Sequence, residues 1–498
     1  MRTEVLRCAA GCALGTLLMP GCTRIDQTAE LQQAREAIES ATGVLPGWSA
    51  DMPVREYRPA AGEVFTLDAA IELALANNRG LRAQVETIGQ AKSDLVQAGL
   101  LSNPIFSIAF RFPEGGGRSN IDFGLVQDFA DLWLIPSRKR AAFAALQQRI
   151  LGLANEATAL VNDVRTAYHR LQYQATAVHL QEQNRRILQE ALALAEARFR
   201  AGDTSQLDVN LTRGRLLEAD LELLQVRAEL DQTRHGLLRL MGAADAGRDF
   251  QPVALTDRVE PPIAPETALV EAALGRRLDV QAANWEVEAA TAEYQQERLK
   301  LFPSLSIGVA AERAESRGPA GPKPFHELAR ESVPNRELTF HELETPGERR
   351  RERAREIDFI IGPSLELPVP IFDQNQAQIA KAWYRARELR ERQAELEQRV
   401  IESVRLAVVA RRLAADRVRF FLDALLPQQQ LNLEFAQKAY QAGQENILTV
   451  LLAQEALIRT RLNFAAAQRD LAISAANLDR EVAGHLQQAA SPTQPVTP

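Results

Sequence analysis

The sequence contains one pattern written twice, and this duplication restricts the possible folds more than any other feature. Leu100–Ile108 aligns without gaps to Leu299–Ile307 at an offset of 199 residues. Phe199–Val209 aligns to Tyr440–Val450 at an offset of 241 residues. The difference of 42 residues falls largely in the charged segment 315–356, so the second copy carries a long insertion. The chain is therefore interpreted as one structural unit built twice.

Each copy is predicted to run helix, strand, strand, long helix, turn and helix. The expected organisation is a signal peptide at 1–21, a lipidated N-terminal linker at 22–65, the first copy at 66–242, a linker at 243–265, the second copy at 266–484 and a disordered tail at 485–498. The tail is assigned as disordered because Gln, Pro, Ser and Thr dominate it.

Apolar spacing predicts a long coiled-coil helix in each copy. From Leu146 to Val178 the apolar residues mostly alternate four and three apart, which is a heptad seam. A helix over 141–200 would be roughly 90 Å long at 1.5 Å per residue. Leu389–Ala407 repeats this spacing, with Gln393 interrupting it. Taken alone, the helices also fit an intracellular coiled-coil scaffold.

Glycines predict a tight turn at the end of each long helix. Gly202 and Gly443 suit the left-handed residue that ends a helix. Ser205 and Asn446 can then cap the next helix. We therefore expect tip turns at 201–205 and 442–446, each joining two antiparallel helices.

Period-two alternation predicts four strands, at about 104–112, 120–129, 303–312 and 357–371. Each has one apolar face and one more polar face. In a soluble sheet the apolar face packs on a core, whereas in an outer-membrane barrel it faces lipid. The flanking helices have their own heptad seams, so the barrel is favoured. Four strands cannot close a barrel, and open edges in lipid are unfavourable. Three subunits would supply twelve strands.

The N-terminus predicts secretion and lipidation. All three cysteines, Cys8, Cys12 and Cys22, lie there, so the body of the chain has no disulfide or cysteine metal site. Arg2 and Arg7 accompany a stretch of apolar and small residues, as in a secretory signal. Leu17–Cys22 resembles a bacterial lipobox, which makes Cys22 the expected lipid-bearing residue. The alternative is a plain signal peptide with an incidental cysteine.

Together, the duplicated unit, the Ala-Gly turns and the lipobox resemble the TolC family of outer-membrane efflux channels, in its lipidated branch. The resemblance covers about 65–484. Leu-Pro-Val-Pro-Ile-Phe-Asp at 367–373 is typical of the family, and Asp131-Leu132-Trp133 is a looser counterpart. It implies a mixed α and β membrane protein: a homotrimer whose twelve-stranded β-barrel, four strands per chain, continues into a helical periplasmic tunnel.

This resemblance implies a passive conduit that exports small molecules or metal ions and is anchored by lipid in the outer membrane. Its partners would be a periplasmic adaptor and an inner-membrane pump. A type I protein secretion channel is the alternative, with a coiled-coil scaffold behind it. The implied tip and adaptor contacts are Ala201, Gly202, Leu207, Asp208, Val209, Ala442, Gly443, Leu448 and Val450. The family often has an aspartate six residues after the tip glycine. Asp208 matches that position and Thr449 does not.

Other function classes find little support. A net charge of −7 and a pI near 5.7 argue against a nucleic-acid partner. No nucleophile–base triad, P-loop or dinucleotide motif is evident, so neither enzyme activity nor a cofactor is expected. Phe325–Leu328 and Phe340–Leu343 both read Phe-His-Glu-Leu but lack the second histidine of zinc proteases. No metal site is predicted, and 315–356 is expected to be a charged extracellular loop.

Overall fold

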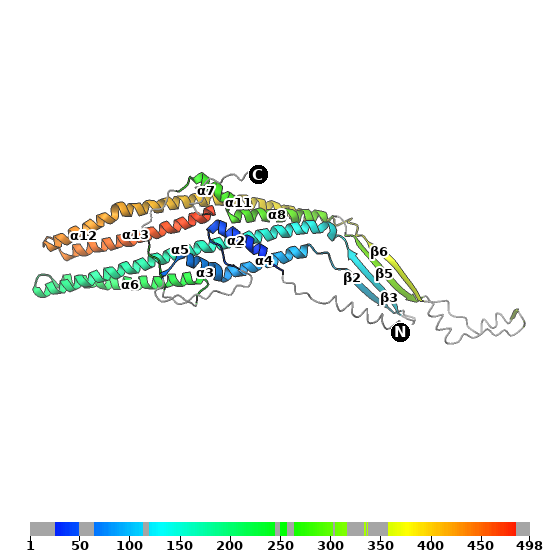
Figure 1. Cartoon of the computed structure of the whole chain (residues 1–498), viewed down its shortest axis with the longest axis horizontal. Helices are drawn as coiled ribbons and strands as arrows, with labels where there is room; N and C mark the ends of the chain where they lie inside the picture. Colours follow the sequence, from blue (N-terminus) through cyan, green and yellow to red (C-terminus); the bar gives the residue numbers. More distant parts are fainter. Residues whose placement is uncertain are drawn as a thin grey trace. The chain divides into compact units, whose positions relative to one another are not determined.

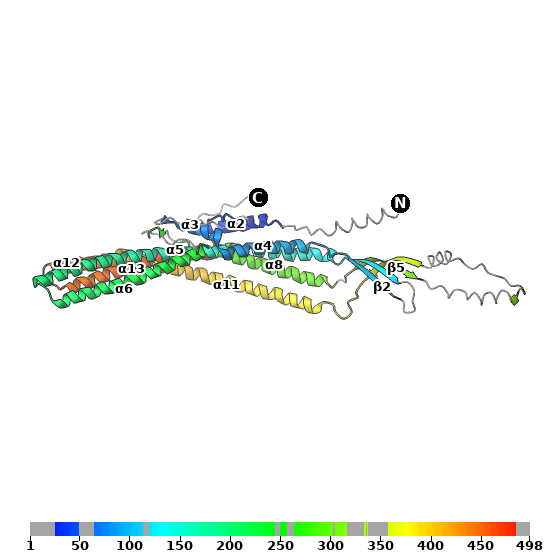
Figure 2. The ribbon, with the colours of Figure 1, turned by 90° about the horizontal axis from the view of Figure 1, so that it is seen from below.

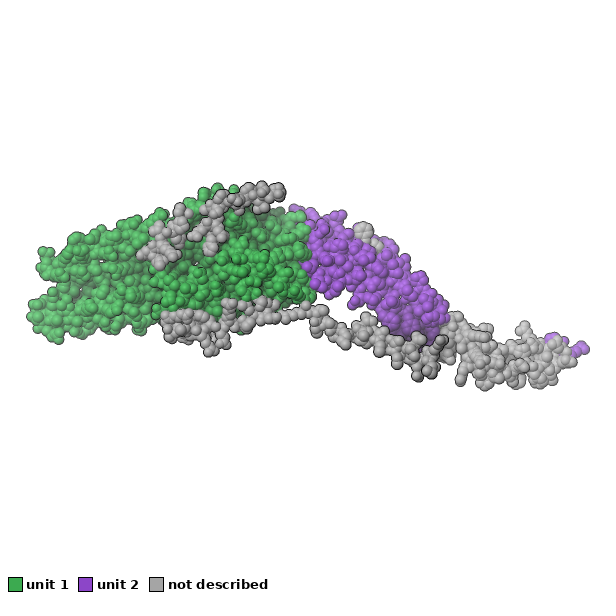
Figure 3. All heavy atoms as spheres, viewed as in Figure 1, with its two compact units in different colours: residues 1–94, 143–288, 388–498 green, residues 95–142, 289–387 purple. Residues whose placement is uncertain are grey.

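The computed structural model describes residues 25–48, 64–112, 119–244, 250–255, 263–301, 304–315, 333–334, 336 and 357–484. Cys22, nearly all of the predicted insertion and the predicted tail lie outside the described residues. The chain divides into two compact units (Figure 3). Unit 1 is 1–94, 143–288 and 388–498, and unit 2 is 95–142 and 289–387. Each unit is described by itself.

The elements follow in chain order (Figure 1). The first half contains α2 Thr28–Thr42, β1 Val64–Phe65, α3 Leu67–Asn77, α4 Arg79–Ala98, β2 Ile105–Arg111, β3 Asn120–Asp128, α5 Asp131–Ala201 and α6 Gln206–Leu240. The second half contains β4 Gln251–Pro252, α7 Glu266–Arg276, α8 Leu278–Leu299, β5 Ser306–Glu315, β6 Ile357–Glu366, α11 Gln376–Phe420, the π-helical turn η1 Phe421–Leu425, α12 Leu426–Gln441 and α13 Ile447–Val482.

Two antiparallel helical hairpins make up much of unit 1, α5 with α6 and α12 with α13 (Figure 2). Seam residues Leu146, Ile150 and Leu171 of α5 are buried, as heptad spacing requires. A second cluster joins α7, α8, α11 and α13. It consists of Leu269, Ala273, Val280, Val400, Val404, Val408, Leu478 and Val482. These contacts give the helices a core within a single chain.

The second long helix is interrupted, which the apolar spacing did not predict. Helix α11 ends at Phe420, the π-turn follows, and α12 begins at Leu426 with Pro427 in its first turn. Proline has no backbone N–H, and its ring clashes with the carbonyl four residues earlier. A π-turn just before Pro427 widens the helix at that point, which accounts for the interruption.

A short parallel pair of strands, β1 with β4, lies beside α5 in unit 1. The rings of Phe65 and Phe250 pack edge to face, 5.4 Å apart. The Tyr168 hydroxyl donates to the Phe65 carbonyl at 2.7 Å and accepts from the Val253 N–H at 3.1 Å. Tyr168 therefore ties this pair to the middle of α5.

Unit 2 contains a four-stranded antiparallel sheet in the order β2-β3-β5-β6. Two strands differ from the sequence prediction by more than one residue at an end. Strand β6 ends at Glu366 rather than near residue 371, because Pro368 and Pro370 have no N–H to donate to a neighbouring strand. Strand β5 spans Ser306–Glu315 instead of 303–312. In the part of the chain that the structure describes, no helix combines the length and apolarity needed to cross a membrane.

Candidate functional site

The strand register places mostly apolar side chains in rows on one face of the sheet, with Arg313 interrupting one row. Residues paired directly across antiparallel strands share a face. The rows are Phe106–Leu125–Val309–Pro363, Ile108–Phe123–Ala311–Ile361 and Phe110–Ile121–Arg313–Phe359. Ile361 is 62% exposed and Phe106 66% exposed. Within the chain, then, this apolar face is not covered as a soluble core would be.

The opposite face is smaller and more polar, although Ile105, Val126 and Ile360 also lie on it. Its rows are Ser107–Gly124–Ala310–Gly362, Ala109–Asp122–Glu312–Ile360 and Asp128–Ser306–Glu366. Arg111 pairs with Asp122 at 2.8 Å across β2 and β3. Among the described strands, the outer edges of β2 and β6 pair with no other strand. The sheet therefore has an apolar side, a polar side and two edges that can still accept partners.

The first hairpin turn is ordered by its own polar groups. Gly202 has a φ of +86° and its N–H bonds to the Phe199 carbonyl at 3.1 Å. Ser205 caps α6, and its hydroxyl and N–H both donate to the Asp208 carboxylate, which closes a capping box. Hydrogen bonds from Ser205 and then Thr204 hold the pKa of Asp208 below its ordinary value. The Asp208 carboxylate is therefore held by hydrogen bonds within its own turn.

The second hairpin turn uses different residues for the same geometry. Gly443 has a φ of +72°, and its N–H bonds to the Tyr440 carbonyl at 3.1 Å. Asn446 caps α13 by accepting the Thr449 N–H at 3.2 Å. No carboxylate follows this cap at the position that Asp208 occupies in the first hairpin.

The predicted tip residues fall into two groups. Ala201, Gly202, Ala442 and Gly443 are exposed at the turns, and Leu207 is 65% exposed. Val209 is buried at 3% exposure. Leu448 is half-buried, and Val450 packs against the cluster of Leu188, Ala219, Ile447 and Leu451. Leu207 is thus free for an external contact, whereas Val209 and Val450 serve packing within the chain.

Two further contacts, neither of them predicted from the sequence, join the hairpins near their turns. Arg215 of α6 pairs with Glu455 of α13 at 3.3 Å. Arg198 of α5 lies over the Tyr440 ring of α12, 4.6 Å from its centroid. The contacts span about 240 residues of sequence, so no local pattern could indicate them.

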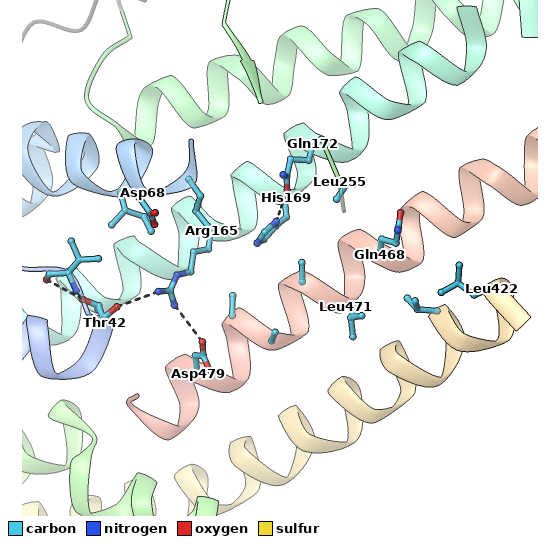
Figure 4. Close-up of a pocket in the computed structure, with 18 residues that line it drawn as sticks. Thr42, Asp68, Arg165, His169, Gln172, Leu255, Leu422, Gln468, Leu471 and Asp479 are labelled. Atoms are coloured by element: carbon cyan, nitrogen blue, oxygen red, sulfur yellow. Dashed lines mark hydrogen bonds and ion pairs between the residues drawn. The ribbon is translucent and has the colours of Figure 1, made fainter. Parts of the chain in front are cut away.

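A cavity of about 570 Å³ lies between α3, α5, α13 and the end of α11 in unit 1 (Figure 4). Arg165, His169 and Gln172 project into it from one face of α5. Arg165 lies 3.9 Å from the Asp479 carboxylate, and His169 Nδ1 lies 2.8 Å from the Gln172 amide oxygen. Burial lowers the pKa of His169, while the Gln172 hydrogen bond partly opposes this shift.

These groups provide little chemistry. Asp479 offsets the charge of Arg165, and the burial that lowers the pKa of His169 favours its neutral imidazole. Across the ranges that the structure covers, no three His, Cys, Asp or Glu side chains come together as a metal site would require. The cavity is therefore a polar cluster between helices without an evident reactive group.

Comparison with known proteins decides the family. The profile of the family described as "Outer membrane efflux protein" matches residues 131–243 and 269–484, about two thirds of the sequence. The chain belongs to the outer membrane efflux protein family. The TolC-type resemblance inferred from the duplicated motifs is thereby confirmed.

Individual relatives of this outer membrane efflux protein are distant. "Multidrug resistance outer membrane protein MdtP" from Shigella flexneri is 28% identical over 234 residues, 46% of this chain and 47% of that protein. The chain thus spans about half the length of that relative. "Cobalt-zinc-cadmium resistance protein CzcC" from Cupriavidus metallidurans is 23% identical over 435 residues, covering 85% of this chain and 91% of CzcC.

The fold of this outer membrane efflux protein is that of solved relatives. A crystal structure of CusC, in a study of its folding and transmembrane channel formation, matches with a TM-score of 0.66 at 20% identity. The match covers 88% of this chain and 99% of CusC. At this identity the likeness shows the shared fold.

Proposed function

We propose that the chain is the outer-membrane channel of a tripartite efflux system. Three copies form a passive conduit that exports small molecules or metal ions, with a periplasmic adaptor and an inner-membrane pump as partners. The observation that carries the proposal is the sheet of unit 2, which has exposed apolar rows on one face, polar rows on the other and unpaired outer edges.

In the proposed channel, lipid covers the apolar face of this sheet, and a second copy pairs with its free edges. Apolar rows facing lipid and polar rows facing water are the arrangement of an outer-membrane barrel. In an antiparallel order of four strands, the free edges of β2 and β6 run in opposite directions. The β6 edge of one copy can therefore pair antiparallel with the β2 edge of the next, and the ring closes. Three copies give twelve strands.

Apolar stripes on the helices of unit 1 support assembly of several copies. Leu217, Leu221 and Leu224 of α6 are 62–68% exposed, and Leu406, Val409 and Leu413 of α11 are 60–63% exposed. The two stripes lie on different elements, so a contact between them is heterologous. Heterologous contacts generate closed rings when the rotation closes.

The proposed placement follows from topology. The insertion at 315–356 joins β5 to β6 and is proposed to lie outside the cell, with both hairpin turns at the periplasmic end facing the adaptor. We also propose that Cys22 is the mature N-terminal residue and carries the lipid. The duplication of the whole unit, with the boundaries given above, remains part of this proposal.

Assembly is tested with Leu217→Glu/Leu221→Glu on the α6 stripe. We expect the trimer to be lost in detergent, because each copy would place two charges in an apolar contact. The matched control is Glu218→Gln, on the same helix turn, which should leave assembly intact. A trimer that survives the double substitution would remove α6 from the interface. Mass spectrometry of the N-terminus tests Cys22 separately, since an unmodified cysteine would contradict lipidation.

A further inference from the structure

The helical segments of unit 2 lie next to its sheet (Figures 1 and 2). They contain more cationic than anionic residues. Described residues 95–104, 129–142, 289–301 and 367–387 hold eight Lys and Arg against four Asp and Glu, a net charge of +4. The whole chain has a net charge of −7. The positive charge is therefore concentrated in these segments.

The cations lie at one level on three neighbouring helices. Asn375, just before α11, donates to the Glu297 carbonyl near the end of α8 at 2.9 Å, so α11 begins level with the end of α8. Arg385 of α11 pairs with Glu293 of α8 at 3.4 Å. From the other side, Arg140 of α5 donates to Gln295 of α8 at 3.0 Å. The basic residues of α5 and α11 thus flank α8 at the same height. We call this surface the basic belt; it consists of Arg138, Lys139, Arg140, Lys381, Arg385 and Arg387.

Part of the basic belt has no acidic partner among the residues that the structure describes. Lys139, Lys381 and Arg387 are exposed and form no ion pair with any residue that the structure describes. Arg387 instead lies over the Trp383 ring, 4.8 Å from its centroid. Three cations per chain are therefore available to an external anion.

Exposed apolar residues lie between the sheet and the basic belt, and aromatic residues lie among the cations of the belt. Ile371 and Phe372, which follow β6, are 67% and 92% exposed. Trp383 and Tyr384 are 39% and 64% exposed. The chain therefore passes from apolar strand to exposed apolar residues, and then to a segment of α11 in which cations and aromatic residues are interspersed, from Lys381 to Arg387. Aromatic and cationic residues beside an apolar band are typical of the membrane interface.

We propose that the basic belt binds the phosphate groups of anionic phospholipids in the leaflet next to the helices. This inference rests on the proposed function, which places the sheet in the bilayer. The first residue of α11 is Gln376, so Lys381–Arg387 lie about 8–17 Å along the helix. Long Lys and Arg side chains reach back toward the phosphates from that depth. Each such cation near an anionic surface favours binding about fivefold.

The test uses the full chain reconstituted in bilayers that contain brominated phosphatidylglycerol or brominated phosphatidylcholine. Bromine quenches nearby tryptophan, and Trp383 lies inside the basic belt. The expected result is a preference of about fivefold or more for phosphatidylglycerol, reduced in 0.5 M NaCl because salt screens exposed charges. A Trp383→Phe variant should remove most of the lipid-selective signal.

Reversing the charge of two basic-belt residues tests whether the belt binds the anionic lipid. Lys381→Glu/Arg387→Glu should bring the lipid preference close to one, whereas the control Arg412→Glu/Arg419→Glu, farther along α11, should leave it unchanged. If the reversed pair fails to assemble, Lys381→Gln/Arg387→Gln should still reduce the preference severalfold. An unchanged preference in the neutral pair, or equal quenching by both lipids in the parent chain, would overturn the inference. Failure of the parent chain to insert into any bilayer would instead contradict the proposed channel.

Discussion

The helices of unit 1 and the sheet of unit 2 both carry apolar side chains at regular spacing, but they bury them differently. Val404 of α11 has no exposed surface and packs in a cluster contributed by the same chain. Ile361 of β6 is 62% exposed, and Val309 of the neighbouring strand β5 is 52% exposed. The helices therefore have a core within one chain, whereas in the proposed channel the sheet depends on lipid and on another copy.

The largest expected effect comes from a charge inside the helical core. Val404→Asp should destabilise unit 1 by about 3–5 kcal/mol, because the carboxylate would be buried without a partner. Ala394→Asp is the control, since Ala394 is exposed on the same helix and is not part of the apolar stripe of Leu406, Val409 and Leu413. Thermal unfolding followed by circular dichroism in detergent compares them. Equal destabilisation would show that the α11 core is not formed within one chain.

The second prediction concerns a charge placed on the exposed apolar face of the sheet. Ile361→Arg should cost about 2–4 kcal/mol in a bilayer, the range for a cation on a lipid-facing strand near mid-membrane. Ile360→Arg, one residue earlier and on the polar face, should be nearly neutral. Denaturant unfolding in lipid vesicles measures both. Should Ile360→Arg prove the more harmful, the two faces have been assigned the wrong way round.

Residue patterns predicted the regular parts of both units. Alternation of Phe106, Ile108 and Phe110 with small or polar neighbours indicated a strand with an apolar face, and β2 has that register. Glycine in a left-handed turn was predictable at Gly202 and Gly443, because few other residues adopt this conformation.

What the patterns missed depends on proline geometry or on distant contacts. Pro368 and Pro370 end β6 early, and Pro427 follows the π-turn, although each proline was a visible signal against continuation. The Arg165–Asp479 and Arg215–Glu455 pairs join residues far apart in sequence. One sequence contains no local pattern for such pairs.

The two turn glycines carry the next prediction. Gly202→Val and Gly443→Val should each cost roughly 1–2 kcal/mol, because a β-carbon is disfavoured at these positive φ values. Nothing lies within 4 Å of the added atom at either site, so the cost is in the backbone. Export should fall while the trimer persists. Gly214→Ala, in the open middle of α6, is the control and should stabilise slightly.

Normal export in both valine variants would argue against a role for the turns in adaptor docking. Loss of the trimer as well would make the turns purely structural.

The smallest effect concerns the difference between the two turns. The pKa of Asp208 is lowered in the folded chain, so its stabilisation is present above the ordinary pKa and disappears as pH falls through the lowered value. Asp208→Asn should therefore cost about 0.3–1 kcal/mol near neutral pH and little in acid. Hydrogen exchange of the first turn of α6 measures this. The first turn of α13, capped by Asn446, should show no such dependence on residue 208.

In the proposed channel the sheet is completed by other copies of the chain, and the native mass of the detergent-solubilised protein measures how many copies assemble. We expect a complex of three chains, with twelve strands. A monodisperse, folded single chain would contradict it.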